Sequence, residues 1–268
     1  MTKRILGLTG AALVLAAPAG MGDSFAPDAA LEAAASKSGD LRIYGEGRRY
    51  NPKSWAAGHD FTGIARKVPA PLHRSAVALA NTDPKRDWIA TAAHTIGGRQ
   101  PPLTFVDAKG RKYTIGPEGS GAKITRKNWM TIPGTDFAIA ECGELPDGIR
   151  KYPIPARMTK EQHESLHDRC VIVTTCNGDR AGLVRASTVN MATADTIGSV
   201  KHPDYPEHYL KGIKGDSGSP WFMPDPRGNL VAVSTFTTPF SGTFFGGPKV
   251  LDWIESQALP ITQVSLVP

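Results

Sequence analysis

Three short segments of the chain hold the side chains that acyl-transfer chemistry requires. His94 follows three small residues, Asp136 opens a short apolar run, and Ser217 lies in a Gly-Asp-Ser-Gly segment. A serine hydroxyl is a weak nucleophile, so it needs a base within hydrogen-bond reach, a carboxylate that orients this base, and donors for the oxyanion. The three segments together contain each of these groups.

The residues around the His and the Asp indicate how the two side chains could meet. The apolar run Trp88-Ile89-Ala90 predicts a strand, so His94 is expected just past a strand end, facing a cleft. In the other run Phe137 and Ile139 point the same way, because side chains alternate along a strand. This arrangement can bury Asp136 beside His94.

The segment around Ser217 is the most specific of the three. Glycines on either side of the Asp-Ser pair allow a tight backbone in which the amides of Gly215 and Ser217 can converge on one oxygen. Taken alone, a Gly-Asp-Ser-Gly segment is about as often an ordinary Gly/Ser-rich loop as it is part of a catalytic site. Finding all three motifs in the order His94, Asp136, Ser217 favours the catalytic interpretation.

At these residues the sequence resembles the secreted trypsin-like (chymotrypsin-fold) serine peptidases of bacterial type, over roughly residues 43–258. The resemblance implies that Ser217 is the nucleophile, that His94 is the general base and then the acid, and that Asp136 holds His94 in the right tautomer. The amides of Gly215 and Ser217 would form the oxyanion hole.

The resemblance also implies a fold class. It is all-β, with two antiparallel six-stranded β-barrels packed face to face and a short C-terminal helix. We expect the N-terminal barrel in residues 43–150 and the C-terminal barrel, with a crossover helix, in residues 151–268. The cleft between the barrels would hold the three catalytic side chains.

Activation by cleavage is a further implication of the resemblance. Arg42-Ile43 is similar to the family's activation site, where a cut after a basic residue frees an Ile amine that pairs with the Asp before the nucleophile, here Asp216. Residues 20–42 would then be a propeptide. The alternative is that Arg42-Ile43 is an ordinary strand start, and the sequence leaves both open.

Substrate preference depends on weaker signals. Lys211, six residues before Ser217, stands where the trypsin subgroup has an Asp, so it could attract an acidic side chain with help from Lys214, or it could extend into solvent. Phe236 could narrow the substrate groove. Ser234 falls where the family places a serine that supports the buried Asp.

Composition excludes several other classes of protein. The 268 residues are 40% hydrophobic and 21% charged, with 28 Gly and 22 Pro, which suits a turn-rich globular protein and not disorder, collagen or a coiled coil. The net charge of +6 comes from scattered basic residues, so no nucleic-acid partner is expected. Residues 1–19 read as a signal peptide, which predicts a secreted or periplasmic monomer with no membrane contact after its removal.

Neither the cysteines nor a zinc-like motif changes this interpretation. Cys142, Cys170 and Cys176 are odd in number, and an extended run separates the last two too widely for a disulfide. Residues 163–167 match H-E-x-x-H, but their helix is polar nearly all round and has no third ligand. We therefore expect a solvated helix, no metal and no cofactor.

The expected elements are short strands and three helices. One helix is expected at 29–35, with too little apolar surface to form a core, one at 159–168, and one at 249–256 with Val250, Trp253 and Ile254 on a single face. The strands are expected at 63–68, 75–79, 103–106, 112–115, 122–124, 136–140, 170–175, 181–184, 188–191, 221–223 and 230–234.

The sequence therefore predicts a secreted serine endopeptidase that cleaves polypeptides through an acyl-enzyme. One alternative is a catalytically silent binding module on the same fold, and another is an esterase that uses the same triad. The α/β-hydrolase elbow does not fit, because Ser219 replaces its last glycine and because those enzymes place the Asp and the His after the Ser.

Overall fold

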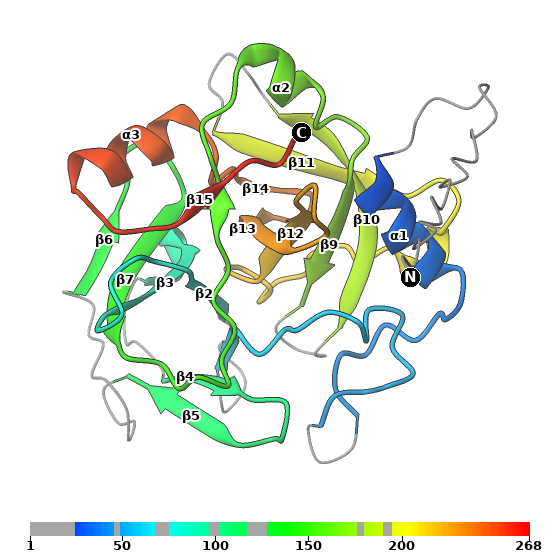
Figure 1. Cartoon of the computed structure of the whole chain (residues 1–268), viewed down its shortest axis with the longest axis horizontal. Coiled ribbons are helices and arrows are strands. Elements are labelled where there is room, and N and C mark those ends of the chain that lie inside the picture. Colours follow the sequence, from blue (N-terminus) through cyan, green and yellow to red (C-terminus); the bar gives the residue numbers. More distant parts are fainter. Residues whose placement is uncertain are drawn as a thin grey trace, which may run out of the picture.

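The chain is mostly β-structure with few helices, and its strands form two antiparallel units (Figure 1). The computed structural model describes residues 25–45, 49–67, 75–96, 102–116, 128–175, 180–189 and 195–268. The expected signal peptide, Cys176 and the expected strand at 122–124 lie outside these residues. Among the described residues, no helix is long and apolar enough to cross a membrane.

The first unit is a seven-stranded antiparallel sheet in the order β5-β4-β1-β2-β3-β7-β6. Its strands are β1 Ile64–Lys67, β2 Ser75–Leu79, β3 Asp87–Ala92, β4 Leu103–Val106, β5 Lys112–Ile115, β6 Trp129–Thr131 and β7 Phe137–Gly143. The sheet has one strand more than expected, and within its described part β5 and β6 are the edges. Its central strands β2 and β3 are buried along their whole length.

The second unit is a closed six-stranded barrel in the order β10-β11-β14-β13-β12-β9. Its strands are β9 Cys170–Thr174, β10 Ala181–Val189, β11 Thr196–Lys201, β12 Pro220–Pro224, β13 Leu230–Thr238 and β14 Ser241–Thr243. The expected six-stranded barrel is confirmed. The two short strands expected at 181–184 and 188–191 belong to the single strand β10 as far as residue 189.

One hydrophobic core joins the two units. Val77 and Leu79 of the sheet belong to the same buried cluster as Phe222 and Ala232 of the barrel. A connecting segment runs from the sheet through β8 Ile154–Pro155 to the helix α2 Lys160–Glu164 (Figure 1). Strand β8 pairs in parallel with β15 Gln263–Val264, so the end of the chain covers the junction.

Helix α2 is shorter than expected, and it begins with the expected capping box. The Thr159 hydroxyl accepts a hydrogen bond from the Gln162 amide, and the Gln162 side chain accepts one from the Thr159 amide. The helix is not polar all round, because His163 is only 3% exposed and packs edge-on against Phe244. His167 lies beyond the helix, exposed and paired with Asp168.

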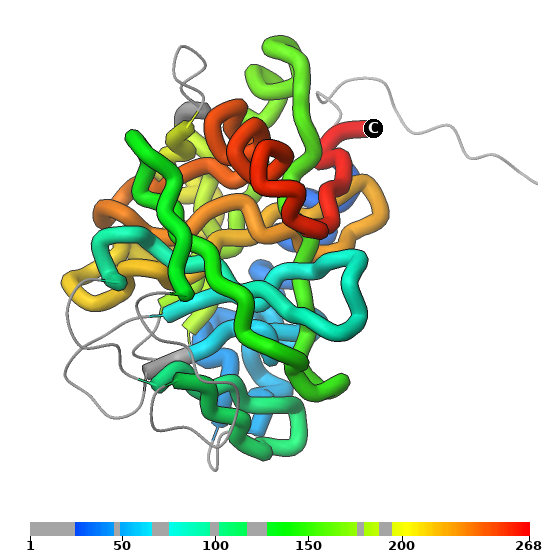
Figure 2. Tube along the Cα trace, turned by 90° about the vertical axis from the view of Figure 1, so that its left-hand side faces the viewer, coloured from blue at the N-terminus to red at the C-terminus, as the bar shows by residue number. Residues whose placement is uncertain are grey.

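The C-terminal helix α3 Pro248–Ser256 confirms the expected element. Val250 and Ile254 are buried as expected, together with Leu251, while Trp253 is partly buried. Figures 1 and 2 place this helix beside β6 and β7, and its buried residues share a cluster with Phe137 of β7.

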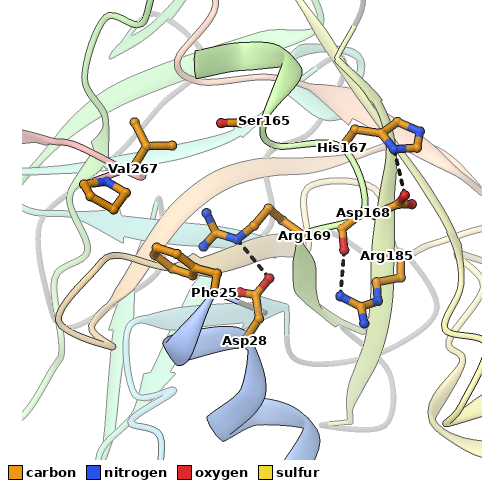
Figure 3. A pocket seen from close by; sticks show the side chains of 9 residues that line it. Phe25, Asp28, Ser165, His167, Asp168, Arg169, Arg185 and Val267 are labelled. Atoms are coloured by element: carbon orange, nitrogen blue, oxygen red, sulfur yellow. Dashed lines mark hydrogen bonds and ion pairs between the residues drawn. The ribbon is translucent and has the colours of Figure 1, made fainter. Parts of the chain in front are cut away.

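The N-terminal helix α1 Ala26–Ala35 begins three residues earlier than expected. It forms no core of its own, and its Leu31 and Ala35 are buried in the main core that the sheet and the barrel share. The buried carboxylate of Asp28 pairs with Arg169 at 2.9 Å, and Figure 3 shows the two side chains pointing toward one another beside a pocket of about 340 Å³. Arg169 also lies 3.6 Å from the Phe25 ring centroid. Contacts to distant barrel residues therefore hold α1 in place.

Candidate active site

Strand pairing places His94 and Asp136 side by side. Strand β3 ends at Ala92, opposite Phe137, the first residue of its antiparallel partner β7. The next residues on each chain, in the 3-10 helix Ala93–Ile96 (η2) and just before β7, therefore lie at the same end of the sheet. The Ala93 amide donates a hydrogen bond to the Asp136 carbonyl at 2.9 Å, which fixes this corner.

The side chains of His94, Asp136 and Ser217 form a continuous chain of hydrogen bonds. His94 Nδ1 lies 2.7 Å from Asp136 Oδ2, and the His94 amide donates to Asp136 Oδ1 at 2.8 Å. His94 Nε2 lies 2.7 Å from Ser217 Oγ. The carboxylate thus contacts the imidazole on the side opposite the hydroxyl. This geometry allows Nε2 to take the hydroxyl proton while the carboxylate steadies the ring.

The electrostatics of Asp136 suit a carboxylate that stays ionised. Its burial acts to raise the pKa, but hydrogen bonds from the His94 ring and amide outweigh this effect and hold the pKa below its ordinary value. Thr237 also lowers the pKa of Asp136. The Thr237 hydroxyl is buried and is not positioned to form a hydrogen bond. The charge needed to stabilise an imidazolium is therefore present at neutral pH.

Ser217 lies in a tight turn between two glycines with positive φ. Gly215 has φ +109° and Gly218 has φ +84°, conformations that residues with a Cβ rarely adopt. The Asp216 amide donates to the Ile213 carbonyl at 3.0 Å, and the Ser219 amide donates to the Asp216 carbonyl at 2.8 Å. This turn holds the Ser217 hydroxyl toward His94. The oxyanion role of the Gly215 and Ser217 amides stays a prediction.

A pocket of about 230 Å³ opens beside Ser217. Phe236 forms part of its wall and packs edge-on against Trp221, with ring centroids 4.9 Å apart. The other lining residues come from the segment before Ser217 and from the end of β13, and they are Gly212, Ile213, Lys214, Thr237, Thr238 and Pro239. The pocket therefore lies where a substrate side chain next to the attacked bond could enter.

The structure brings only some of the expected specificity residues to this pocket. Phe236 and Lys214 line it, whereas Lys211 does not, because its ammonium group lies over the Phe240 ring, 4.7 Å from the centroid. Ser234 is fully buried in the barrel and donates to the Thr235 carbonyl. The hydroxyl that bonds to Asp136 is that of Thr243, which accepts a hydrogen bond from the Asp136 amide at 3.2 Å, while Thr237 on β13 lowers the pKa of the carboxyl. The expected contact between Ser234 and Asp136 is not formed.

The chain is uncut between Arg42 and Ile43, the residues expected to form the activation site. Arg42 is exposed and pairs with Asp40 at 2.7 Å, while Ile43 is buried. Asp216 is fully buried, and its Oδ2 accepts a hydrogen bond from the Ile213 amide at 3.0 Å. The hydrogen bonds that join Asp136, His94 and Ser217 are thus formed in the uncut chain.

Comparisons with known proteins add little to this geometry. No family model matches the sequence, and no curated protein matches it either. Among solved structures, the chain is similar to kallikrein-related peptidase 10, with 14% identity, a TM-score of 0.46, and coverage of 74% of this chain and 95% of that one. A second structure, the same peptidase in complex with Zn²⁺, gives 14% identity, a TM-score of 0.45, and coverage of 73% and 93%. Because identity and TM-score are both low, the assignment of an all-β fold with a closed six-stranded barrel rests on the strands of this chain themselves.

Proposed function

We propose that this chain is a serine endopeptidase. The observation that carries the proposal is the unbroken chain of contacts from Asp136 through His94 to Ser217, with both side-chain distances at the ring nitrogens equal to 2.7 Å. Ser217 Oγ attacks the carbonyl carbon of the substrate, and its proton passes to His94 Nε2. Asp136 stabilises the imidazolium that forms.

The second half of the reaction uses the same groups. The amides of Gly215 and Ser217 donate to the oxyanion of the tetrahedral intermediate. Its collapse breaks the peptide bond, and His94 gives its proton to the leaving amine, which leaves an ester on Ser217. Water then attacks this ester with His94 as base, and the acid product departs. Side chains and backbone amides supply every group in this scheme, so it requires no metal or cofactor.

The pocket beside Ser217 supports a preference for acidic side chains in a polypeptide substrate. Lys214 is the cationic residue among the groups that line it. A substrate carboxylate could accept a hydrogen bond from its ammonium group. The wall formed by Phe236 limits the depth of the pocket and disfavours large aromatic residues.

The proposed cellular setting follows from the N-terminus. Residues 1–19 would direct export and be removed, leaving a secreted or periplasmic enzyme that acts as a monomer. Activation by a cut after Arg42 is the alternative to an enzyme that is active without cleavage.

The experiment that tests the function is covalent labelling with a fluorophosphonate, read by intact mass. One adduct on Ser217, absent in Ser217→Ala and in His94→Ala, is the expected result. Ser219→Ala is the matched control, because Ser219 lies two residues away with a buried hydroxyl that has no partner. Labelling that persists in Ser217→Ala, or no labelling of the folded protein, contradicts the proposal, and the latter outcome favours a silent binding module.

A comparison of matched ester and peptide substrates separates an endopeptidase from an esterase. Cleavage of a polypeptide at internal bonds, abolished in Ser217→Ala, supports the endopeptidase. Turnover of esters with no peptide cleavage supports the esterase.

A further inference from the structure

Three side chains that the catalytic scheme does not use converge behind helix α1. Glu32 lies on α1, Cys170 is the first residue of β9, and His202 directly follows β11. The Cys170 sulfur lies 3.9 Å from Glu32 Oε1 and 3.9 Å from His202 Nε2, and the last two atoms are 3.2 Å apart. Cys170 and His202 are fully buried, and Glu32 is partly buried.

These distances resemble the edges of a tetrahedral zinc site. With zinc bonds of about 2.3 Å to sulfur, 2.0 Å to imidazole nitrogen and 2.0 Å to a carboxylate, the donor atoms lie about 3.3 to 3.6 Å apart. A shift of the sulfur by a few tenths of an ångström would complete the match. We propose that Glu32, Cys170 and His202 form a binding site for a zinc-type divalent cation. Thiolate, imidazole and carboxylate together suit zinc better than calcium or magnesium, which prefer oxygen donors.

Before a cation can bind, the groups that now contact the three ligand atoms must move. Arg185 pairs with Glu32 Oε1, so the guanidinium would move to the other oxygen of the same carboxylate. His202 Nδ1 accepts a hydrogen bond from the Asp204 amide at 3.2 Å, which places the ring proton on Nε2. This proton would move to Nδ1, and the Nδ1–H would then donate to a new acceptor in place of the Asp204 amide, a role that a neighbouring carboxylate such as that of Asp204 takes for metal-bound histidines.

The proton balance of the site follows from these changes. The Cys170 thiol loses its proton when the sulfur–metal bond forms, so one proton is released for each cation bound.

The site would tie the N-terminal segment to the loop that leads to the nucleophile. His208, six residues after His202, is fully buried, and its Nε2 lies 2.9 Å from the Ser38 carbonyl. The chain then runs through Leu210, which packs close to Gly182, into the turn around Ser217. A cation held by α1, β9 and His202 would therefore stabilise the docking of α1 and of this loop together.

Cobalt titration of the full-length, metal-stripped protein tests the site directly. We expect one equivalent of Co²⁺ to give a thiolate-to-cobalt charge-transfer band, and Zn²⁺ to displace it. Cys170→Ser should abolish the band, and Glu32→Gln should weaken zinc binding at least about tenfold. Cys142→Ser is the matched control, because Cys142 is equally buried but lies in β7, away from this cluster, and Cys176→Ser tests the third cysteine.

Thermal unfolding keeps the proposal testable if Cys170→Ser folds poorly. Zinc should raise the melting temperature of the wild type and of Cys142→Ser, and it should have little effect on Glu32→Gln, whose partly exposed position makes a folding defect less severe. A missing cobalt band in the wild type, a band retained in Cys170→Ser, or equal zinc stabilisation of Glu32→Gln and the wild type would overturn the proposal.

Discussion

Gly218, next to Ser217, touches the N-terminal sheet so closely that a Cβ there would meet Thr91 Oγ1 at 2.3 Å. The same Cβ would meet the Ser75 carbonyl oxygen at 2.4 Å, the acceptor to which Thr91 donates at 2.6 Å. The turn that carries Ser217 therefore packs against the strands that position His94. This contact couples the two units at the proposed site.

Substitution of Gly218 should weaken the contact between the turn that carries Ser217 and the strands that position His94. Gly218→Ala has both a positive φ of +84° and a clash with backbone, so we expect it to lower the free energy of unfolding and to slow fluorophosphonate labelling strongly. Gly228→Ala is the matched control, because Gly228 has φ +82° with nothing within 4 Å of the added Cβ. The backbone conformation costs about 1–2 kcal/mol in either variant, and the clash adds about 1–3 kcal/mol only at Gly218. Equal losses of stability in urea unfolding would contradict the coupling.

The pKa of Asp136 predicts how acid affects the protein. Because the folded-state pKa is below the ordinary value of 3.8, ionised Asp136 stabilises the fold above about pH 4, and this contribution is lost as the pH falls through the folded value. Asp136→Asn removes this dependence and also favours the wrong His94 tautomer. We expect labelling of this variant to slow by about 10⁴-fold at neutral pH.

Urea unfolding of the wild type and Asp136→Asn across acidic pH checks the stability part of this prediction. The difference in the free energy of unfolding between the two proteins should shrink as the pH falls below about 4. A difference that does not change with pH would show that the carboxylate charge does not stabilise the fold.

Local patterns sufficed to predict that Asp136, His94 and Ser217 meet, because each lies at the end of a strong strand signal or inside a glycine turn. His94 follows the buried strand β3, and Asp136 precedes its partner β7. The threonines near Asp136 could not be predicted in this way. Thr237 lies at an irregularity of β13, whose register shifts between Phe236 and Thr238, and Thr243 lies on the separate strand β14.

Local patterns in the sequence also could not predict how α1 packs against the rest of the protein. Its sequence is rich in alanine, and its position depends on Asp28 meeting Arg169, which lies 141 residues away along the chain. The convergence of Glu32, Cys170 and His202 is hidden for the same reason, since no spacing in the sequence links the three residues.

The anchoring of α1 by Asp28 predicts a large effect of a small change. Asp28→Ala leaves Arg169 buried without its carboxylate and frees the Cys170 amide, which now donates to Asp28 at 2.9 Å. Breaking one side of a buried ion pair costs about 3–5 kcal/mol. Asp252→Ala is the control, because the Arg157–Asp252 pair is exposed and should contribute less than about 1 kcal/mol. Equal effects of the two variants in urea unfolding would mean that α1 is not anchored through Asp28.

The connection between Arg42 and Ile43 gives a test of activation. The triad is formed with these residues joined, and the buried Asp216 carboxylate already accepts a hydrogen bond from Ile213. We expect Arg42→Gln to label within about twofold of the wild-type rate, because the uncut chain already holds the turn around Ser217. Loss of labelling in Arg42→Gln, together with Ile43 as the N-terminus of active wild type, would instead establish activation by cleavage.

Two lysines near Ser217 separate the explanations of substrate preference. Lys214 lines the pocket, whereas the Lys211 ammonium lies over the Phe240 ring. We expect the wild type to cleave faster after Glu or Asp than after Arg. Lys214→Gln should lower the ratio of kcat/KM for Glu over Gln at that position by about tenfold, which corresponds to about 1.4 kcal/mol. Lys211→Gln is the matched control and should change this ratio by less than about twofold. A larger effect of Lys211→Gln would return the role to Lys211, and faster cleavage after Arg in the wild type would exclude an acidic preference altogether.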